Sequence, residues 1–168
     1  FRRAKWNEPV NDHLVARHER EVFPLLLQRA LFAGVRNFAL YDFISDGGGI
    51  DEDVYAYSNR SRDGQTRALV LFNNRFKSTR GRIVRSVPVR QEDGSLVTWE
   101  LPEALGLSHA SGFTVFRDVC SGLEFLRPSA EVMGEGFAWK LEAFEYRVFD
   151  GFDVVHATET LPYDRLCE

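Results

Sequence analysis

Acidic, histidine and serine side chains are the residues of this chain that can perform acid–base, nucleophilic or metal chemistry. The acidic loop of Asp46 and residues 51–53 offers the oxygen ligands that calcium prefers, but it lacks the alternating acid spacing of an EF-hand. The four histidines are scattered along the chain, at His13, His18, His109 and His156. His13 and His18 are five residues apart and so do not share a helical face. We therefore expect no metal site and no cofactor.

Two Ser-Gly pairs and several glutamates are the remaining candidates for catalysis. Ser111-Gly112 and Ser121-Gly122 lack the flanking glycine pattern of a nucleophile elbow and are interpreted as turns. Glu124, Glu142 and Glu145 fall in or beside expected strands, where alternating residues face solvent. The sequence thus contains no recognisable catalytic constellation.

Aromatic residues are the strongest binding candidates. Flat rings stack on the apolar C–H faces of sugars, and four residues suit this role: Tyr55, Tyr57, Trp99 and Trp139. Tyr55 and Tyr57 are two apart on one expected strand and therefore share a face. The alternative is that these rings fill the core, as large aromatic side chains commonly do.

The composition and net charge of the chain argue against nucleic acids and membranes as binding partners. The chain has 168 residues, 44% hydrophobic content and a net charge of −4, so neither a phosphate backbone nor an anionic membrane surface should attract it. No apolar run approaches the roughly 20 residues that span a bilayer. Two cysteines without metal-ligand spacing indicate reduced thiols in a cytoplasmic protein. The start at Phe1 and the single Met133 suggest a piece of a longer polypeptide.

The first third of the sequence predicts helices. Asn11 or Asp12 can cap a helix, and the apolar residues that follow recur at helical spacing. Pro24 either kinks this helix or opens a second one, and Gly34 is a plausible stop.

The remainder predicts strands separated by glycine turns such as Asp63-Gly64 and Asp93-Gly94. The expected strands are Val54–Asn59, Arg67–Asn73, Arg82–Arg90, Leu96–Leu101, Phe113–Asp118, Leu123–Pro128, Phe137–Leu141, Glu145–Phe149 and a last one at Phe152–Val155. This pattern predicts a mainly β protein, an antiparallel β-sandwich of about eight strands after an N-terminal helical segment. We divide the chain into a helical segment (1–50), a sandwich (51–157) and a tail (158–168).

The order of these segments resembles the C-terminal region of α-amylase superfamily glycoside hydrolases. HEREVFPLLLQRALFAGV, from His18, resembles the last helix of the catalytic barrel and its exit. DVYAYSNR with ALVLFNN, ending in Asn73-Asn74, resembles the first two strands of the sandwich called domain C. DVCSGLEFLRPS and WKLEAFEYRVF resemble its closing hairpin, although Glu142-Ala143 stands where the family often has Pro.

The resemblance implies a non-catalytic accessory domain. The family's catalytic carboxylates lie at the ends of barrel strands, and no segment here resembles those strands, so the chain alone should not hydrolyse glycosides. Its expected partner is the catalytic barrel of the parent enzyme, with α-glucan as a second partner. Apolar surface left bare without the barrel should promote self-association. Two alternatives stay open: an independent carbohydrate-binding module, and an unrelated β-sandwich that binds a ligand.

Overall fold

The computed structural model describes residues 5–91, 93–107 and 111–167, so His109 and Phe1 lie outside the described residues. Within these ranges the chain forms eleven strands, five α-helices and one 3₁₀-helix. The fold is mainly β, with antiparallel sheets packed as a sandwich after an N-terminal helical segment, which confirms the predicted class. No described helix combines the length and apolar character needed to cross a membrane.

Six antiparallel strands form the larger sheet, in the order β1-β3-β4-β11-β8-β9. Their bounds are Ala39–Tyr41 (β1), Val54–Arg60 (β3), Arg67–Asn73 (β4), Tyr146–Val155 (β11), Phe113–Asp118 (β8) and Glu124–Pro128 (β9). Gly64 takes a φ of 73° in the turn from β3 to β4, a conformation that costs glycine little. The expected hairpin at Asp63-Gly64 is therefore present.

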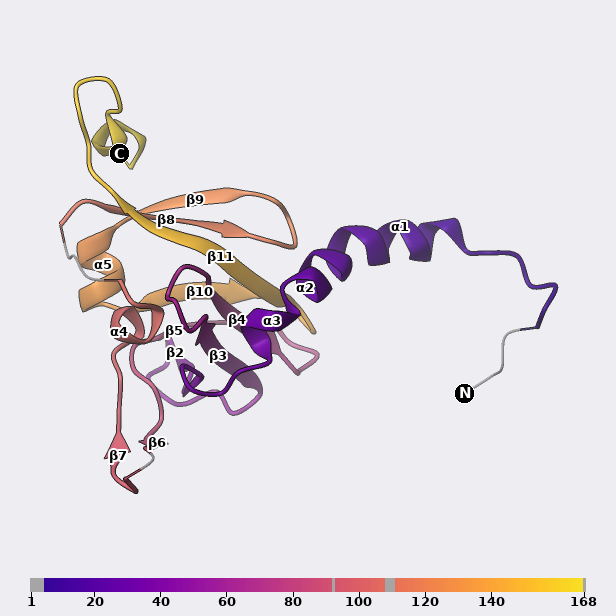
Figure 1. Ribbon diagram of the computed structural model, residues 1–168, viewed down its shortest axis with the longest axis horizontal. Helices are drawn as coiled ribbons and strands as arrows, with labels where there is room; N and C mark the ends of the chain where they lie inside the picture. The colour runs from indigo at the N-terminus through magenta and orange to yellow at the C-terminus, as the bar shows by residue number, and fades with distance from the viewer. Residues whose placement is uncertain (1–4, 92, 108–110, 168) are drawn as a thin grey trace.

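A three-stranded sheet packs across the larger one. Its order is β10-β5-β2, with bounds Phe137–Leu141 (β10), Thr79–Ile83 (β5) and Ile44–Ser45 (β2). A separate hairpin of Val89–Arg90 (β6) and Leu96–Val97 (β7) projects from the body of the molecule (Figure 1). Both β1 and β2 belong to the sheets although they precede residue 51.

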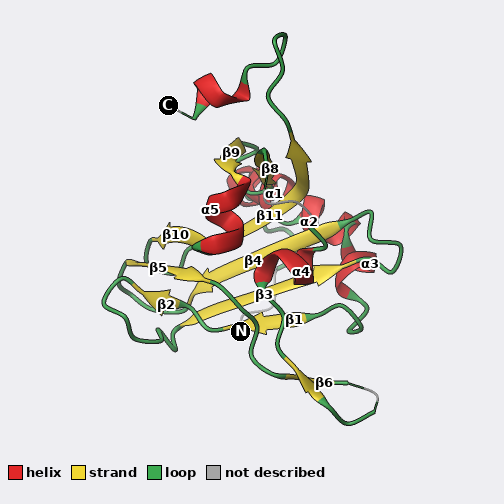
Figure 2. Cartoon of the chain, turned by 90° about the vertical axis from the view of Figure 1, so that its left-hand side faces the viewer, coloured by secondary structure: helices red, strands yellow, loops and turns green. Residues whose placement is uncertain are grey.

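The core lies between the two sheets and is dominated by phenylalanine. Phe116, Phe137 and Phe149 are fully buried, and their ring centroids lie 5.1 to 5.5 Å apart. Two short helices, Leu101–Leu105 (α4) and Ser129–Gly134 (α5), lie beside the smaller sheet (Figure 2). Leu101, Leu105 and Val132 of these helices are buried, so the helices complete this side of the core.

The N-terminal helices lie on the opposite side of the larger sheet. They are Asp12–Glu21 (α1), Phe23–Leu27 (α2) and Arg29–Phe32 (α3), and a 3₁₀-helix, Tyr163–Leu166 (η1), lies near the other end of the chain. Asn11 caps α1, because its side-chain oxygen accepts a hydrogen bond from the backbone N–H of Leu14 at 3.1 Å. Pro24 lies in the first turn of α2, as in the second of the two expected arrangements. Figure 1 shows α1 projecting away from the sheets.

Two expected strands are wrong in the middle of the chain. The expected strand Arg82–Arg90 is divided between β5 and β6, because the chain leaves the smaller sheet after Ile83: Ser86 pairs with Tyr41, and the Val87 N–H donates to the Leu40 carbonyl. The expected strand Leu96–Leu101 ends at Val97, because Glu100 is the N-cap of α4, which begins at Leu101. Glu100 and Glu103 form a capping box there: each side chain accepts a hydrogen bond from the other residue's backbone N–H.

The C-terminal strands also differ from expectation. The two strands expected at 145–149 and 152–155 join into β11, with a bulge between Asp150 and Asp153. β10 and β11 do not pair with each other, because these strands belong to different sheets. Phe144, at a φ of 53°, lies in the connection that turns the chain from one sheet to the other.

Candidate docking surface

The outer face of the six-stranded sheet, turned away from the core, carries a row of apolar and aromatic side chains. Tyr55 pairs in register with Phe72, and Tyr57 with Val70, so alternate residues of β3 and β4 meet on one face. Tyr146 of β11 pairs with Phe72 from the other side. The rings of Tyr55 and Phe72 stack with centroids 6.2 Å apart. We call this surface, with Leu40 and Val148, the outer face.

Helices α2 and α3 cover only part of the outer face. Asn59 fixes α3 there, since its side-chain amide donates to the carbonyl oxygens of Leu31 at 2.9 Å and Gly34 at 2.7 Å. A hollow of about 560 Å³ remains between the helices and the sheet, lined by Leu25, Phe32, Leu40, Tyr55, Tyr57, Val70, Phe72, Tyr146 and Val148. Apolar hollows of this size commonly receive a ligand or an anchoring side chain.

The uncovered part of the outer face is accessible. Tyr55 is 50% exposed, whereas Tyr57 is half-buried between its neighbours. Burial raises the pKa of the Tyr57 phenol, because the phenolate would lose solvation. The Tyr57 hydroxyl therefore stays neutral at ordinary pH, and both tyrosines present ring surface in the hollow.

The N-terminal segment carries further exposed apolar side chains. No residue of α1 is buried, Trp6 is 98% exposed and Leu27 is 86% exposed. Glu21 accepts hydrogen bonds from Arg17 and Arg20, which lower the pKa of its carboxyl group to about 2. The Tyr146 hydroxyl donates to Glu21 at 3.4 Å and links the end of α1 to the sheet. Trp6 and Leu27 are thus exposed apolar side chains outside the lining of the hollow.

The structure brings two of the four sequence candidates together. Tyr55 and Tyr57 share the outer face, as their spacing predicts. Trp99 and Trp139 are partly buried against the core on the other side of the larger sheet. Trp99 is not in a strand as expected: it precedes α4, and its backbone exchanges hydrogen bonds with Ser86.

Sequence reasoning missed the partners of the two tyrosines. Phe72 and Val70 lie within the continuous apolar run from Ala68 to Phe72, which indicates a strand covered on both faces but not which residues face outward. Tyr146 and Leu40 reach the outer face only through pairing between distant strands. The register of β4 against β3 shows which residues of β4 face outward, because Phe72 and Val70 lie opposite Tyr55 and Tyr57.

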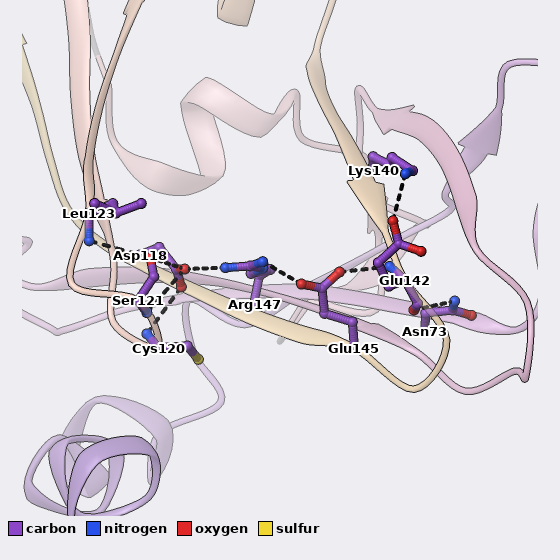
Figure 3. Close-up of polar contacts among 9 residues, drawn as sticks. All are labelled: Asn73, Asp118, Cys120, Ser121, Leu123, Lys140, Glu142, Glu145 and Arg147. Carbon is purple, nitrogen blue, oxygen red and sulfur yellow. Dashed lines mark hydrogen bonds and ion pairs between the residues drawn. The ribbon is translucent and has the colours of Figure 1, made fainter. Parts of the chain in front are cut away.

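A buried polar network lies on the inner side of the same sheet (Figure 3). Asp118, whose side chain is fully buried, accepts hydrogen bonds from Arg147 and from the backbone and hydroxyl of Ser121. Arg147 also pairs with Glu145, whose other oxygen accepts from the backbone N–H of Glu142. Since each carboxylate is engaged, the network holds the β8–β9 turn and the end of β11 in place.

The acidic loop is occupied by internal contacts. Asp51 accepts a hydrogen bond from the Thr79 hydroxyl at 2.7 Å and pairs with Arg75, which also pairs with Asp53. Across residues 5–91, 93–107 and 111–167, no group of three or more His, Cys, Asp or Glu side chains is placed to hold a metal ion. The loop is a structural connection between β2 and β3.

No protein-family model matches this chain, and a search of curated proteins finds no match. The outer face and its hollow are therefore interpreted from their own geometry. They form an apolar docking surface with two tyrosine hydroxyls, whereas the Asp118 and Glu145 carboxylates of the inner network are engaged by Arg147.

Proposed function

We propose that this chain is a non-catalytic C-terminal accessory domain of an α-amylase-type glycoside hydrolase, which docks on the catalytic barrel and stabilises it. The outer face carries the proposal: a half-covered aromatic sheet surface stands beside helices whose apolar side chains are exposed. Large contiguous apolar patches mark interaction surfaces. The order of helix, exit and sandwich, which resembles that family's C-terminal region, supports the choice of partner.

Under the same proposal, this chain alone does not hydrolyse glycosides. The carboxylates of the inner network are held by Arg147 and by backbone N–H groups, which keep them from a reacting sugar. Both cysteines are free thiols, which supports a cytoplasmic location as part of the proposal.

The first test is the reading frame upstream of the codon for Phe1. We expect a segment that encodes barrel strands with two aspartates and a glutamate at their ends. That segment, expressed separately with an affinity tag, should bind the 168-residue chain in size-exclusion chromatography and calorimetry. A reading frame without a barrel, or a monodisperse chain with no affinity for it, would overturn the proposal.

The interface is tested with a matched pair of variants. Tyr55→Lys places a charge on the outer face and should weaken barrel binding by about tenfold or more, because a charge would be desolvated at an apolar contact. Leu123→Lys changes an exposed leucine in the β8–β9 turn, which does not line the hollow of the outer face. It should bind like the unchanged chain, and equal losses in both variants would contradict docking through the outer face.

A further inference from the structure

A second hollow lies at the place where β11 separates from β4. The two strands pair as far as Asp150 and Ala68, so the ladder stops one residue short of Arg67, and a bulge in β11 follows at once. A space of about 430 Å³ remains there, bounded by α2, α3, the β3–β4 turn and β8. We call it the bulge hollow. It shares no lining residue with the hollow of the outer face.

The bulge hollow has one positive charge more than its carboxylate neutralises. Its charged lining residues are Arg67, Arg117 and Asp150. Arg117 pairs with Asp150 through two hydrogen bonds, and the side-chain amide of Gln28 donates to the same carboxylate. Since Asp150 is fully engaged by these groups, Arg67 is the cation that remains.

Arg67 has no carboxylate partner in residues 5–91, 93–107 and 111–167. Its guanidinium donates to the backbone carbonyl oxygens of Gly106 at 3.1 Å and Gly64 at 3.2 Å, which uses two of its five N–H groups. The Nε–H is buried without an acceptor. A partly buried cation without a counter-ion is costly, because it loses hydration and gains no opposite charge.

A second arginine adds to this surplus. Arg60 of β3 pairs in register with Arg67, and like charges opposite each other in a sheet repel. Burial and the charge of Arg60 lower the pKa of the Arg67 guanidinium, against a weaker opposite effect of Asp153. The described chain supplies no carboxylate partner for Arg60 either. An anion beside Arg67 would therefore compensate a charge that the fold leaves uncompensated.

The remaining lining adds uncharged polar groups and apolar surface. The side chains of Gln65 and Thr66 form no hydrogen bond with the described residues, and Leu27 and Phe152 supply apolar atoms. A carboxylate brings one negative charge and two oxygens that accept from several donors at once, which matches this surplus. We propose that the bulge hollow binds a small organic monocarboxylate, with its charged group at Arg67 and an apolar body against Leu27 and Phe152.

The test is an NMR titration of the full 168-residue chain with sodium benzoate, a monocarboxylate with an apolar body. We expect saturable shifts in the Nε–H signal of Arg67 and in the backbone amides of the β3–β4 turn. Benzamide has the same ring without the charge. It should bind about tenfold or more weakly, the effect of losing a charge-assisted hydrogen bond.

Variants of two arginines from the same part of the chain give the matched comparison. Arg67→Gln should weaken benzoate binding by about tenfold or more, and Arg67→Lys should restore part of it because the charge returns. Arg62→Gln removes an exposed charge from the β3–β4 turn, outside the lining, and should bind benzoate like the unchanged chain. Equal losses in Arg67→Gln and Arg62→Gln would overturn the site.

The titrations of the unchanged chain decide the proposal even if Arg67→Gln does not fold. An Arg67 Nε–H signal that benzoate does not shift, or equal binding of benzoate and benzamide, would overturn the carboxylate site. Binding of inorganic phosphate without benzoate would overturn the organic class. Tyr55→Lys should bind benzoate fully while it loses barrel binding, because Tyr55 does not line the bulge hollow, so the two proposals can fail separately.

Discussion

Gln28 and Asp150, 122 residues apart in sequence, are joined by a hydrogen bond of 2.8 Å from the side-chain amide to the carboxylate. Arg117 donates two further hydrogen bonds to the same carboxylate, at 3.0 and 3.1 Å. Asp150 lies at the bulge of β11, and Gln28 lies between α2 and α3. This nearly buried carboxylate therefore fastens the N-terminal helices to the larger sheet.

Asp150→Ala should loosen the helices and lower stability. It leaves Gln28 and Arg117 without their acceptor, so we expect the free energy of unfolding to fall by about 1–3 kcal/mol. Hydrogen exchange should become faster in residues 23–32, and urea denaturation measures the stability. Asp153→Ala, at an exposed position of the same strand, is the control and should change little. Equal effects of the two substitutions would show that Asp150 does not fasten the helices.

Asn73 should tolerate substitution poorly, unlike its neighbour Asn74. The buried Asn73 amide donates to the carbonyl oxygens of Lys77 at 2.7 Å and Glu142 at 2.8 Å. Asn73→Ala leaves both carbonyls unpaired, so we expect a loss of about 2–4 kcal/mol in urea denaturation. The Asn74 side chain is exposed, and Asn74→Ala should cost far less. If Asn73→Ala lowered the free energy of unfolding only slightly, water would have to donate to the two carbonyl oxygens in place of the amide.

Strands with clear turns at both ends were predictable from the sequence. β4, β8 and β10 have the expected bounds, because apolar runs between glycine or polar turns specify an extended segment locally. The helices α4 and α5 were not predicted, since five or six residues are too few to show a helical period. The capping pair Glu100 and Glu103 was the available signal for α4.

The candidate site was predictable only in part. Tyr55 and Tyr57 share a face because side chains alternate along any strand, whatever the fold around them. The position of Trp139 depends on which sheet β10 joins, and this strand pairs with β5, more than fifty residues earlier. Long-range pairing of this kind leaves no local pattern. The division of the four aromatic candidates between the outer face and the core side of the larger sheet therefore required the structure.

The two cysteines should differ in reactivity. Burial, with the nearby charge of Asp118, raises the pKa of the Cys120 thiol to about 11, whereas Cys167 is exposed. Only the thiolate reacts with iodoacetamide, so at about pH 8 Cys167 should be alkylated first and Cys120 about 100-fold more slowly than a free thiol. Mass spectrometry of the peptides measures both rates. Cys120 lies in the turn after β8.

The raised pKa of the Cys120 thiol also determines how the stability of the fold changes with pH. The folded chain favours the neutral Cys120 thiol, so this contribution to stability is present below the unfolded pKa, 9.0, and is lost as the pH rises through about 11. Cys120→Ser should therefore lose less stability than the unchanged chain between those pH values, in urea denaturation. Cys167→Ser is the control. A parallel decline of all three proteins would exclude Cys120 as the source.

Gly81 should be intolerant of any side chain, because two strands approach it closely. It pairs with Trp139 of β10 and Ser45 of β2 in the middle of the smaller sheet. A Cβ atom at Gly81 would lie 2.2 Å from the carbonyl oxygen of Ile44 and 2.7 Å from the Phe43 ring. Gly81→Ala must therefore push β2 away from β5, at an expected cost of about 1–3 kcal/mol.

Gly134→Ala is the matched control for Gly81→Ala. Gly134 ends α5, and a Cβ there would meet nothing within 4 Å. Since alanine favours a helix over glycine by up to about 1 kcal/mol, this substitution should leave stability unchanged or raise it. Urea denaturation of the two variants should then move the midpoint in opposite directions. If Gly81→Ala left the midpoint unchanged, β2 would not be held against β5 at the spacing described.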